Sequence, residues 1–167
     1  MLACIPAARA AGEVTSADLQ ATARSLGFLE NLRRDGPLVI GIVYAPSGAD
    51  ARTAAGQAAE RLASIPGPNG STLRTIVIAA DGLDQTSERL DAIFLMPGAS
   101  TGGTPLSGVV RRRRLLSIST DPACIDQQCC VLMVCTGSGV EIVLQTALAD
   151  VVGARFSTVF MMMVKRQ

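Results

Sequence analysis

The stretch LVIGIVY, from Leu38 to Tyr44, has no charged residue and no alternation of apolar with polar side chains. Successive side chains of a strand point to opposite faces, so a strand of this composition is buried on both faces. Gly36 and Pro37 stand directly before it and prevent a preceding helix from continuing. The stretch therefore predicts an inner strand of a sheet that helices cover on both sides.

Segments with helical and with strand-like patterns alternate on either side of this strand. We expect helices at residues 15–36, 49–65, 83–90, 105–114 and 146–164, the last with a break near Gly153, and further strands at residues 72–79, 91–96, 115–119, 130–135 and 140–144. Such alternation is typical of a mainly parallel sheet. The sequence TGSG at residues 136–139 predicts a tight turn between two antiparallel strands. The expected fold class is α/β, a single-domain three-layer sandwich over residues 15–167 with an antiparallel hairpin near the C-terminus.

The composition argues against catalysis. The 167 residues include no histidine, which removes Ser/His/Asp triads, Cys/His nucleophilic pairs and mixed Cys/His zinc sites. We interpret Asp81, Asp84, Glu88 and Asp91 as helix caps and a solvated helix face rather than as a catalytic pair. We therefore expect no enzymatic activity, and no catalytic, cofactor-binding or metal-binding residues.

Charge and hydropathy argue against two kinds of partner. Fifteen basic and fourteen acidic residues leave a net charge of +1, and the aromatic residues are four Phe and one Tyr, so neither charge nor base stacking favours nucleic acid. The most apolar run, residues 159–164, is far shorter than the roughly 20 residues that span a bilayer. We expect no nucleic-acid partner and no transmembrane segment.

Four of the five cysteines lie within residues 124–135. A short loop separates Cys124 from Cys129 and Cys130, so a disulfide from Cys124 to either of them would reinforce the entry to the strand at residues 130–135, and both pairings stay open. We expect Cys135 to be a small buried apolar side chain. A zinc site is disfavoured because no CxxC pair exists and adjacent cysteines in a strand point apart.

A glycine-rich loop follows the strand at residues 91–96. Its candidate ligand residues, for an anion or another small molecule, are Gly98, Ser100, Thr101, Gly102 and Gly103. The loop lacks the Lys-Ser/Thr ending and the glycine spacing of nucleotide-binding motifs, and the alternative interpretation is a plain strand-to-helix connection.

A run of four arginines ends the helix expected at residues 105–114. Positive charge at that position complements the helix dipole, which makes a solvated helix end the simplest interpretation. The alternative is a docking patch for an acidic partner, formed by Arg111, Arg112, Arg113 and Arg114.

Residues 1–14 are interpreted as the remnant of an export signal or as a disordered N-terminus. The small residues Ala8 and Ala10 around Arg9 resemble the end of a secretory signal whose start lies upstream. A second interpretation places the end of a lipoprotein signal at Cys4. Export would permit a disulfide.

Much of the chain, roughly residues 20–165, resembles the YfiR-like family of exported bacterial proteins. The segments that carry the resemblance are residues 26–32, GPLVIGIVY at 36–44, DAIFL at 91–95, LLSISTDP at 115–122, CVLMV at 130–134, VEIVL at 140–144 and GARFS at 153–157. The chain departs from the family where Cys129 and Cys130 replace a Gly-Gly pair, where Gln145 replaces an Asn, and in the methionines at residues 161–163.

The resemblance implies a non-enzymatic periplasmic regulator that acts by protein–protein binding. Its implied partner is a membrane signalling protein such as a diguanylate cyclase, which it would repress in cyclic-di-GMP signalling, and it can form a homodimer. The alternative function is a periplasmic small-molecule binding domain whose ligand lies above the strand ends, near residues 44–48 and 98–103.

Overall fold

The computed structural model describes residues 13–167. The helices are α1 Ser16–Leu26, α2 Ala51–Ala63, α3 Leu106–Arg113, α4 Ala123–Asp126, α5 Thr146–Val152 and α6 Thr158–Met163, with short 3-10 turns η1 Pro68–Gly70 and η2 Ala80–Gln85. The strands are β1 Leu38–Tyr44, β2 Leu73–Ala79, β3 Ala92–Leu95, β4 Ser117–Ser119, β5 Leu132–Thr136, β6 Val140–Leu144 and β7 Lys165–Arg166.

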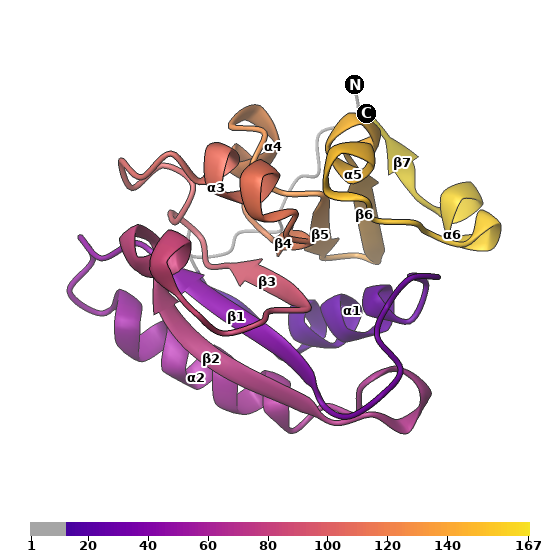
Figure 1. Cartoon of the computed structure of the whole chain (residues 1–167), viewed down its shortest axis with the longest axis horizontal. Coiled ribbons are helices and arrows are strands. Elements are labelled where there is room, and N and C mark those ends of the chain that lie inside the picture. The colour runs from indigo at the N-terminus through magenta and orange to yellow at the C-terminus, as the bar shows by residue number, and fades with distance from the viewer. Residues whose placement is uncertain (1–12) are drawn as a thin grey trace.

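The described strands form one sheet in the order β2-β1-β3-β4-β5-β6-β7. Neighbouring strands are parallel except β5 and β6, which form an antiparallel hairpin. Helices α1 and α2 pack together on one face, whereas α3 and α5 contact each other on the opposite face (Figure 1). The predicted α/β class, with a mainly parallel sheet and a C-terminal hairpin, is therefore confirmed.

The stretch LVIGIVY is β1, and residues 38–43 are all buried. It lies between β2 and β3 with a helix layer on each face, which explains why it carries no polar alternation. The core is aliphatic, and its largest fully buried side chains include Phe94, Leu19 and Leu62.

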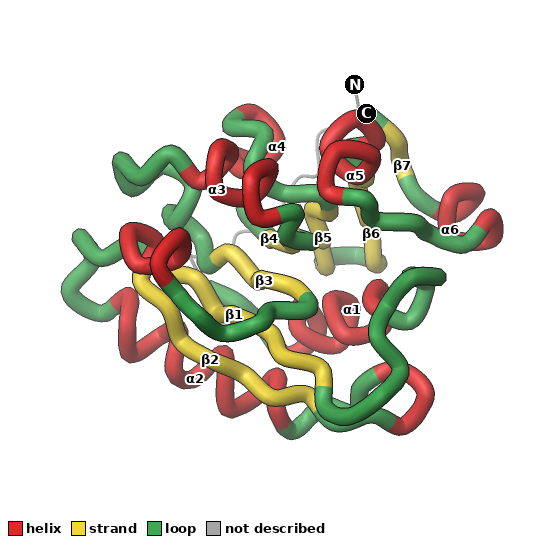
Figure 2. Tube along the Cα trace, viewed as in Figure 1, coloured by secondary structure: helices red, strands yellow, loops and turns green. Residues whose placement is uncertain are grey.

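The first helix is shorter than predicted. It ends at Leu26, where the Gly27 N–H bonds to the Arg24 and Ser25 carbonyls, and not at Gly36. The apolar residues that follow are held by the C-terminal part of the chain: Leu29 forms an isolated antiparallel bridge with Phe156, and the ring of Phe28 stacks on Phe160 at 4.9 Å. The segment after α1 is therefore an irregular connection (Figure 2), because tertiary contacts override its helical spacing.

The prediction of a helix at residues 83–90 is wrong. The chain forms the 3-10 turn η2 and then runs irregularly to β3. The Arg113 guanidinium donates to the carbonyls of Leu83 and Thr86, so these carbonyls bind a distant side chain instead of the amides of a following helical turn.

The C-terminal helix breaks as expected. Gly153 adopts a left-handed conformation, with φ of 76°, and ends α5, and α6 begins after Ser157, whose hydroxyl accepts from the Phe160 N–H. The sequence did not predict β7, which adds to the sheet beside β6. No helix in residues 13–167 is both long enough and apolar enough to cross a membrane.

The export-signal residues Cys4, Ala8, Arg9 and Ala10 lie outside the described residues. Of the N-terminal segment predicted at residues 1–14, Glu13 and Val14 are described, and Val14 is 3% exposed in the core. The packed domain therefore includes Val14, one residue earlier than the boundary predicted from the helix cap.

Candidate functional site

The strand order reverses between β1 and β3. The chain passes from β1 to β2 on one side and then returns to β3 on the other, so the loops after β1 and β3 leave the sheet in opposite directions. In open parallel sheets, ligands bind outside the carboxyl ends of the strands at such a point. We call this region, residues 44–50 and 96–105, the carboxyl-edge site; it lies at the left of Figure 1.

The two loops of the carboxyl-edge site touch each other. The Met96 N–H donates to the Val43 carbonyl at 2.8 Å, which continues the pairing of β1 with β3. A Cβ atom on Gly102 would lie 2.9 Å from the Cβ of Ala45, closer than real Cβ atoms approach. Gly102 therefore permits the close approach of the loops, and the structure brings the two predicted segments together.

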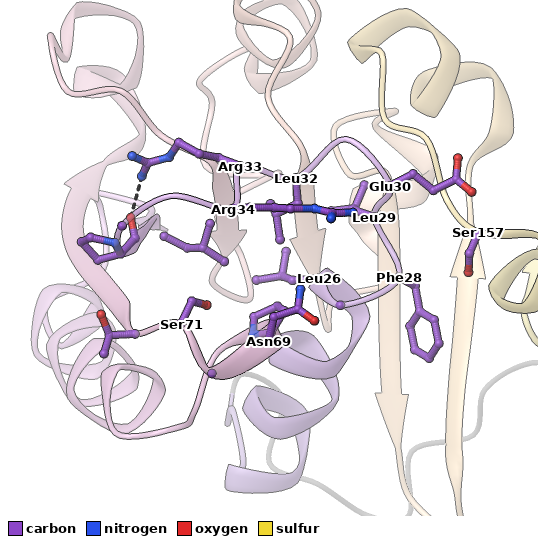
Figure 3. A pocket seen from close by; sticks show the side chains of 17 residues that line it. Leu26, Phe28, Leu29, Glu30, Leu32, Arg33, Arg34, Asn69, Ser71 and Ser157 are labelled. Carbon is purple, nitrogen blue, oxygen red and sulfur yellow. Dashed lines mark hydrogen bonds between the residues drawn. The ribbon is translucent and has the colours of Figure 1, made fainter.

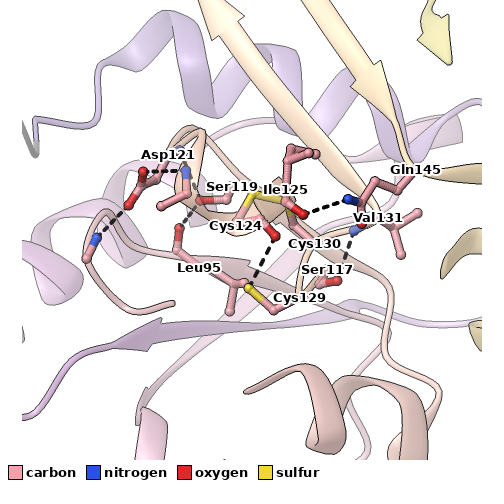
Figure 4. The surroundings of a disulfide bond; sticks show 12 residues. Leu95, Ser117, Ser119, Asp121, Cys124, Ile125, Cys129, Cys130, Val131 and Gln145 are labelled. Carbon is pink, nitrogen blue, oxygen red and sulfur yellow. Dashed lines mark hydrogen bonds between the residues drawn. A yellow bond between two sulfur atoms is a disulfide. The ribbon is translucent and has the colours of Figure 1, made fainter. Parts of the chain in front are cut away.

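Asp121, at the end of β4, holds the second loop. Its carboxylate accepts the Gly98 N–H at 2.9 Å and the Ala123 N–H at 3.0 Å. The Ser119 hydroxyl accepts from the Asp121 N–H and donates to the Leu95 carbonyl at 2.9 Å (Figure 4). A carboxylate thus occupies a peptide donor that a bound anion would use, and its negative charge opposes an anion at the predicted glycine-rich loop.

The loop contains one buried polar group that has no partner among residues 13–167. Ser100 is 9% exposed, and its hydroxyl makes no hydrogen bond with any of these residues. The neighbouring Thr101 hydroxyl, by contrast, donates to the Gly98 carbonyl, while Gly98 and Gly103 adopt φ values of 81° and 87°. A buried hydroxyl without a partner is rare and costs free energy, so Ser100 is the polar group of this loop that a ligand would satisfy.

The cysteine cluster forms a structural bridge. Cys124 in α4 and Cys130 before β5 are disulfide-bonded with their Cα atoms 5.4 Å apart, which selects one of the two predicted pairings (Figure 4). Cys129 is a free thiol, buried, and donates to the Cys124 carbonyl. Burial raises the pKa of Cys129 to about 11, and the charge of Asp121 acts in the same direction. Cys129 therefore stays a protonated thiol at neutral pH.

The expectation for Cys135 is wrong. It is half-buried and disulfide-bonded rather than a free buried side chain. Strand alternation places a side chain on one face of a sheet but does not say whether a second thiol lies against it, which is why the sequence pattern missed this bond.

The arginine run makes contacts within its own chain. Arg111 donates to Gln128 at 3.0 Å, Arg112 pairs with Asp84 at 2.7 Å, and Arg113 binds the two carbonyls near η2. Arg114 takes the left-handed conformation, with φ of 52°, that ends α3. Three of these four arginine side chains therefore make contacts within the chain, so few unpaired guanidinium groups remain in the predicted docking patch.

Sequence reasoning missed a hollow at the opposite end of the sheet. We call it the amino-end hollow; it has a volume of about 780 Å³ and lies beside the starts of β1 and β2 (Figure 3). Its walls come from the irregular segment after α1, from η1 and from Ser157 before α6. These segments are far apart in sequence, so no local motif signals the hollow. Among the described residues, no group of three or more potential ligand side chains is placed to hold a metal ion.

Comparisons with known proteins identify the fold but no family. No family model and no curated protein matches the chain. Among solved structures, the ABC domain in complex with L-Trp from Streptococcus pneumonia aligns with a TM-score of 0.58 at 12% identity, over 89% of this chain and 61% of that one. A substrate-binding protein with adhesive properties from Clostridium difficile, in its ligand-free open form, aligns with a TM-score of 0.51 at 12% identity, over 78% of this chain and 54% of that one. The chain thus spans about three-fifths and about half of these two proteins.

Proposed function

We propose that this chain is a small-molecule binding domain whose ligand lies at the carboxyl-edge site. The observation that carries the proposal is the buried hydroxyl of Ser100, which has no partner in the described part of the chain and lies in the loop where the strand order reverses. The two similar structures are described as an L-Trp complex and as a substrate-binding protein, which supports this function over the regulatory alternative.

The site favours a neutral or amine-bearing solute. Asp121 already supplies a carboxylate to the loop, and the ionisable side chains of residues 44–50 and 96–105 are Tyr44 and Asp50. An anion would meet negative charge there without a cation from either loop. A small neutral or zwitterionic molecule would avoid that repulsion through its ammonium or amide group.

Thermal unfolding in the presence of neutral and zwitterionic amino acids, beginning with L-tryptophan, tests this function. A ligand present at 100 times its Kd stabilises a folded protein by about 2.7 kcal/mol. We expect one or more of these compounds to raise the unfolding temperature of the wild-type chain. Ser100→Ala should reduce the shift because it removes the hydroxyl, and Gly102→Ala should reduce it because the added methyl group separates the loops.

Two control variants make the result specific. Gly56→Ala lies in α2, where an added Cβ meets no atom within 4 Å, and Arg74→Gln removes an exposed charge at the start of β2. Both should retain the full ligand-induced shift. Failure of the whole panel to raise the unfolding temperature, or equal shifts in Ser100→Ala and Gly56→Ala, would contradict the proposal.

The resemblance to the YfiR-like family leaves a second candidate function, binding to a membrane signalling protein. The observation that favours it is the exposed apolar surface of α6, where Val159, Met162 and Met163 are 62%, 80% and 61% exposed. Cellular cyclic-di-GMP should then rise when the gene is deleted and fall again on complementation, but not on complementation with Met162→Lys. An unchanged level in the deletion strain would remove this candidate.

Export to an oxidising compartment accompanies either function. Cys124 and Cys130 are bonded to each other, and Cys135 is disulfide-bonded as well. Such bonds form and persist mainly outside the cytosol. Mass measurement of alkylated protein taken directly from cells, with and without a reductant, tests this: labelling of these cysteines without a reductant would oppose an exported location.

A further inference from the structure

The amino-end hollow has the size and the floor of a ligand site. Its volume of about 780 Å³ falls within the range of roughly 300 to 1,000 Å³ that is usual for small-molecule pockets. The partly exposed side chains of Phe28, Leu29 and Leu32 line it with apolar surface. Water over such a surface is readily displaced by an apolar group, so the floor suits a ring or a short hydrocarbon chain.

The charged side chains of the hollow are not equivalent. Arg33 donates to both carboxylate oxygens of Asp91, at 3.3 and 2.9 Å, and to the Pro37 carbonyl. Arg34 makes no hydrogen bond or ion pair with any described residue, and Figure 3 shows its side chain extending across the hollow. Glu30 also lines the hollow, but its carboxylate is directed outward in the same view. Within the described residues, the charge that faces the hollow without a partner is therefore positive.

The adjoining surface extends this positive character. A second hollow of about 580 Å³ shares Gly27 and Pro68 with the first, and its one ionisable lining side chain is Arg24, which has no partner among the described residues. The acidic groups nearby are Asp91, which Arg33 neutralises, Glu30, which is directed away from the hollow, and Asp35, which is exposed beside Arg34 in the sequence.

The wall opposite Arg34 carries two neutral polar side chains. The hydroxyl of Ser71 is buried and makes no hydrogen bond with the described residues. Asn69 takes the left-handed conformation, with φ of 55°, in η1, and its exposed side-chain amide is without a partner in residues 13–167. Figure 3 shows both residues across the hollow from Arg34. A ligand between these walls would meet the Arg34 guanidinium on one side and the exposed Asn69 amide on the other.

We propose that the amino-end hollow is a second binding site, for a small organic anion that carries an aromatic or aliphatic group. The carboxylate or sulfonate of this ligand pairs with Arg34, whose planar donors match such a group in a bidentate manner. The apolar part lies on the leucine and phenylalanine floor. This site differs from the carboxyl-edge site in position and in preferred charge, so either one can exist without the other.

Fluorescence titration with 8-anilinonaphthalene-1-sulfonate, an aromatic sulfonate, tests the proposal on the full chain. We expect saturable binding to the wild type and a Kd about tenfold higher in Arg34→Gln, which is the effect of losing roughly one charge-assisted hydrogen bond. Arg112→Gln removes the same charge from an exposed arginine that is already paired with Asp84, and it should change the Kd by less than about twofold.

A second variant and a competition experiment distinguish binding at this site from nonspecific binding of the dye. Asn69→Asp is nearly isosteric, tolerates the left-handed conformation and places a carboxylate opposite Arg34, so it should weaken binding of the dye as well. Indole-3-acetate should displace the dye, whereas tryptamine, the cation with the same ring, should not. The proposal is overturned by absent dye binding, by equal Kd values in Arg34→Gln and Arg112→Gln, or by equal displacement with both competitors.

Discussion

Removal of the Cys124–Cys130 disulfide tests how the most cysteine-rich part of the chain is stabilised. The two residues are six positions apart, and the loss of loop-closure entropy for so short a loop corresponds to about 2 kcal/mol at 25 °C. Both side chains are fully buried, and removing a buried heavy atom costs about 1 kcal/mol. The double variant Cys124→Ala/Cys130→Ala should therefore lose about 4 kcal/mol of the free energy of unfolding.

The matched control is Cys129→Ala, which removes one buried sulfur next to the bridge and closes no loop. It should lose about 1 kcal/mol. With a urea dependence of about 2 kcal/mol per molar, the unfolding midpoints should fall by about 2 M and about 0.5 M respectively. These measurements need no reductant, so the disulfide at Cys135 stays intact in every sample.

The comparison between the two variants tests the chain-entropy argument. The double variant must lose about 2 kcal/mol more than twice the loss in Cys129→Ala, because only it removes a cross-link. A loss equal to twice that of the control would show that the bridge acts through its buried sulfur atoms alone, and the chain-entropy argument would be refuted for this loop.

Three further outcomes follow from single residues. The Cys129 thiol, with a pKa of about 11, should resist iodoacetamide at pH 8 in the folded protein, and rapid labelling there would contradict its burial. The free energy of unfolding should fall as pH rises from about 9 to 11, because the thiol of the unfolded chain releases its proton first. Gly153→Ala should lower the free energy of unfolding by about 1 kcal/mol, because a side chain disfavours its φ of 76°. Gly56→Ala in α2 should instead raise the free energy of unfolding by about 0.5–1 kcal/mol. Melting temperatures that shift in the same direction in both variants would count against this account. Asp91→Asn should make the segment after α1 more susceptible to limited proteolysis, because it weakens the hydrogen bonds that the Asp91 carboxylate accepts from Arg33 and from the Val39 N–H. Cleavage at the wild-type rate would show that these bonds do not hold the segment in place.

Much of the fold was predictable because its signals are local. The run from Leu38 to Tyr44 shows burial on both faces without reference to any other segment, and the turn at residues 136–139 identifies the hairpin. Gly153 was identified as a break because glycine is the residue that most readily adopts a positive φ. The carboxyl-edge site was also partly predictable, since ligand loops follow strands at the point where the order reverses.

The missed features depend on contacts between distant residues. The segment after α1 has helical spacing, but a bridge from Leu29 to Phe156 holds it in an irregular path. Arg113 occupies carbonyls that a helix at residues 83–90 would need. Each of these competing contacts joins residues between 27 and 127 positions apart, and no local pattern reports such a contact.

The sequence by itself determined the α/β class, the inner position of β1 and the likeness of the glycine-rich loop to a ligand loop, because side-chain periodicity and backbone preference act over a few residues. Tertiary structure alone decided which cysteine pairs with Cys124, that Asp121 holds the glycine-rich loop, and that Arg34 faces a hollow without a partner among the described residues. The physical reason is that pairing, burial and charge compensation are properties of positions in space, and the fold brings those positions together from remote parts of the chain.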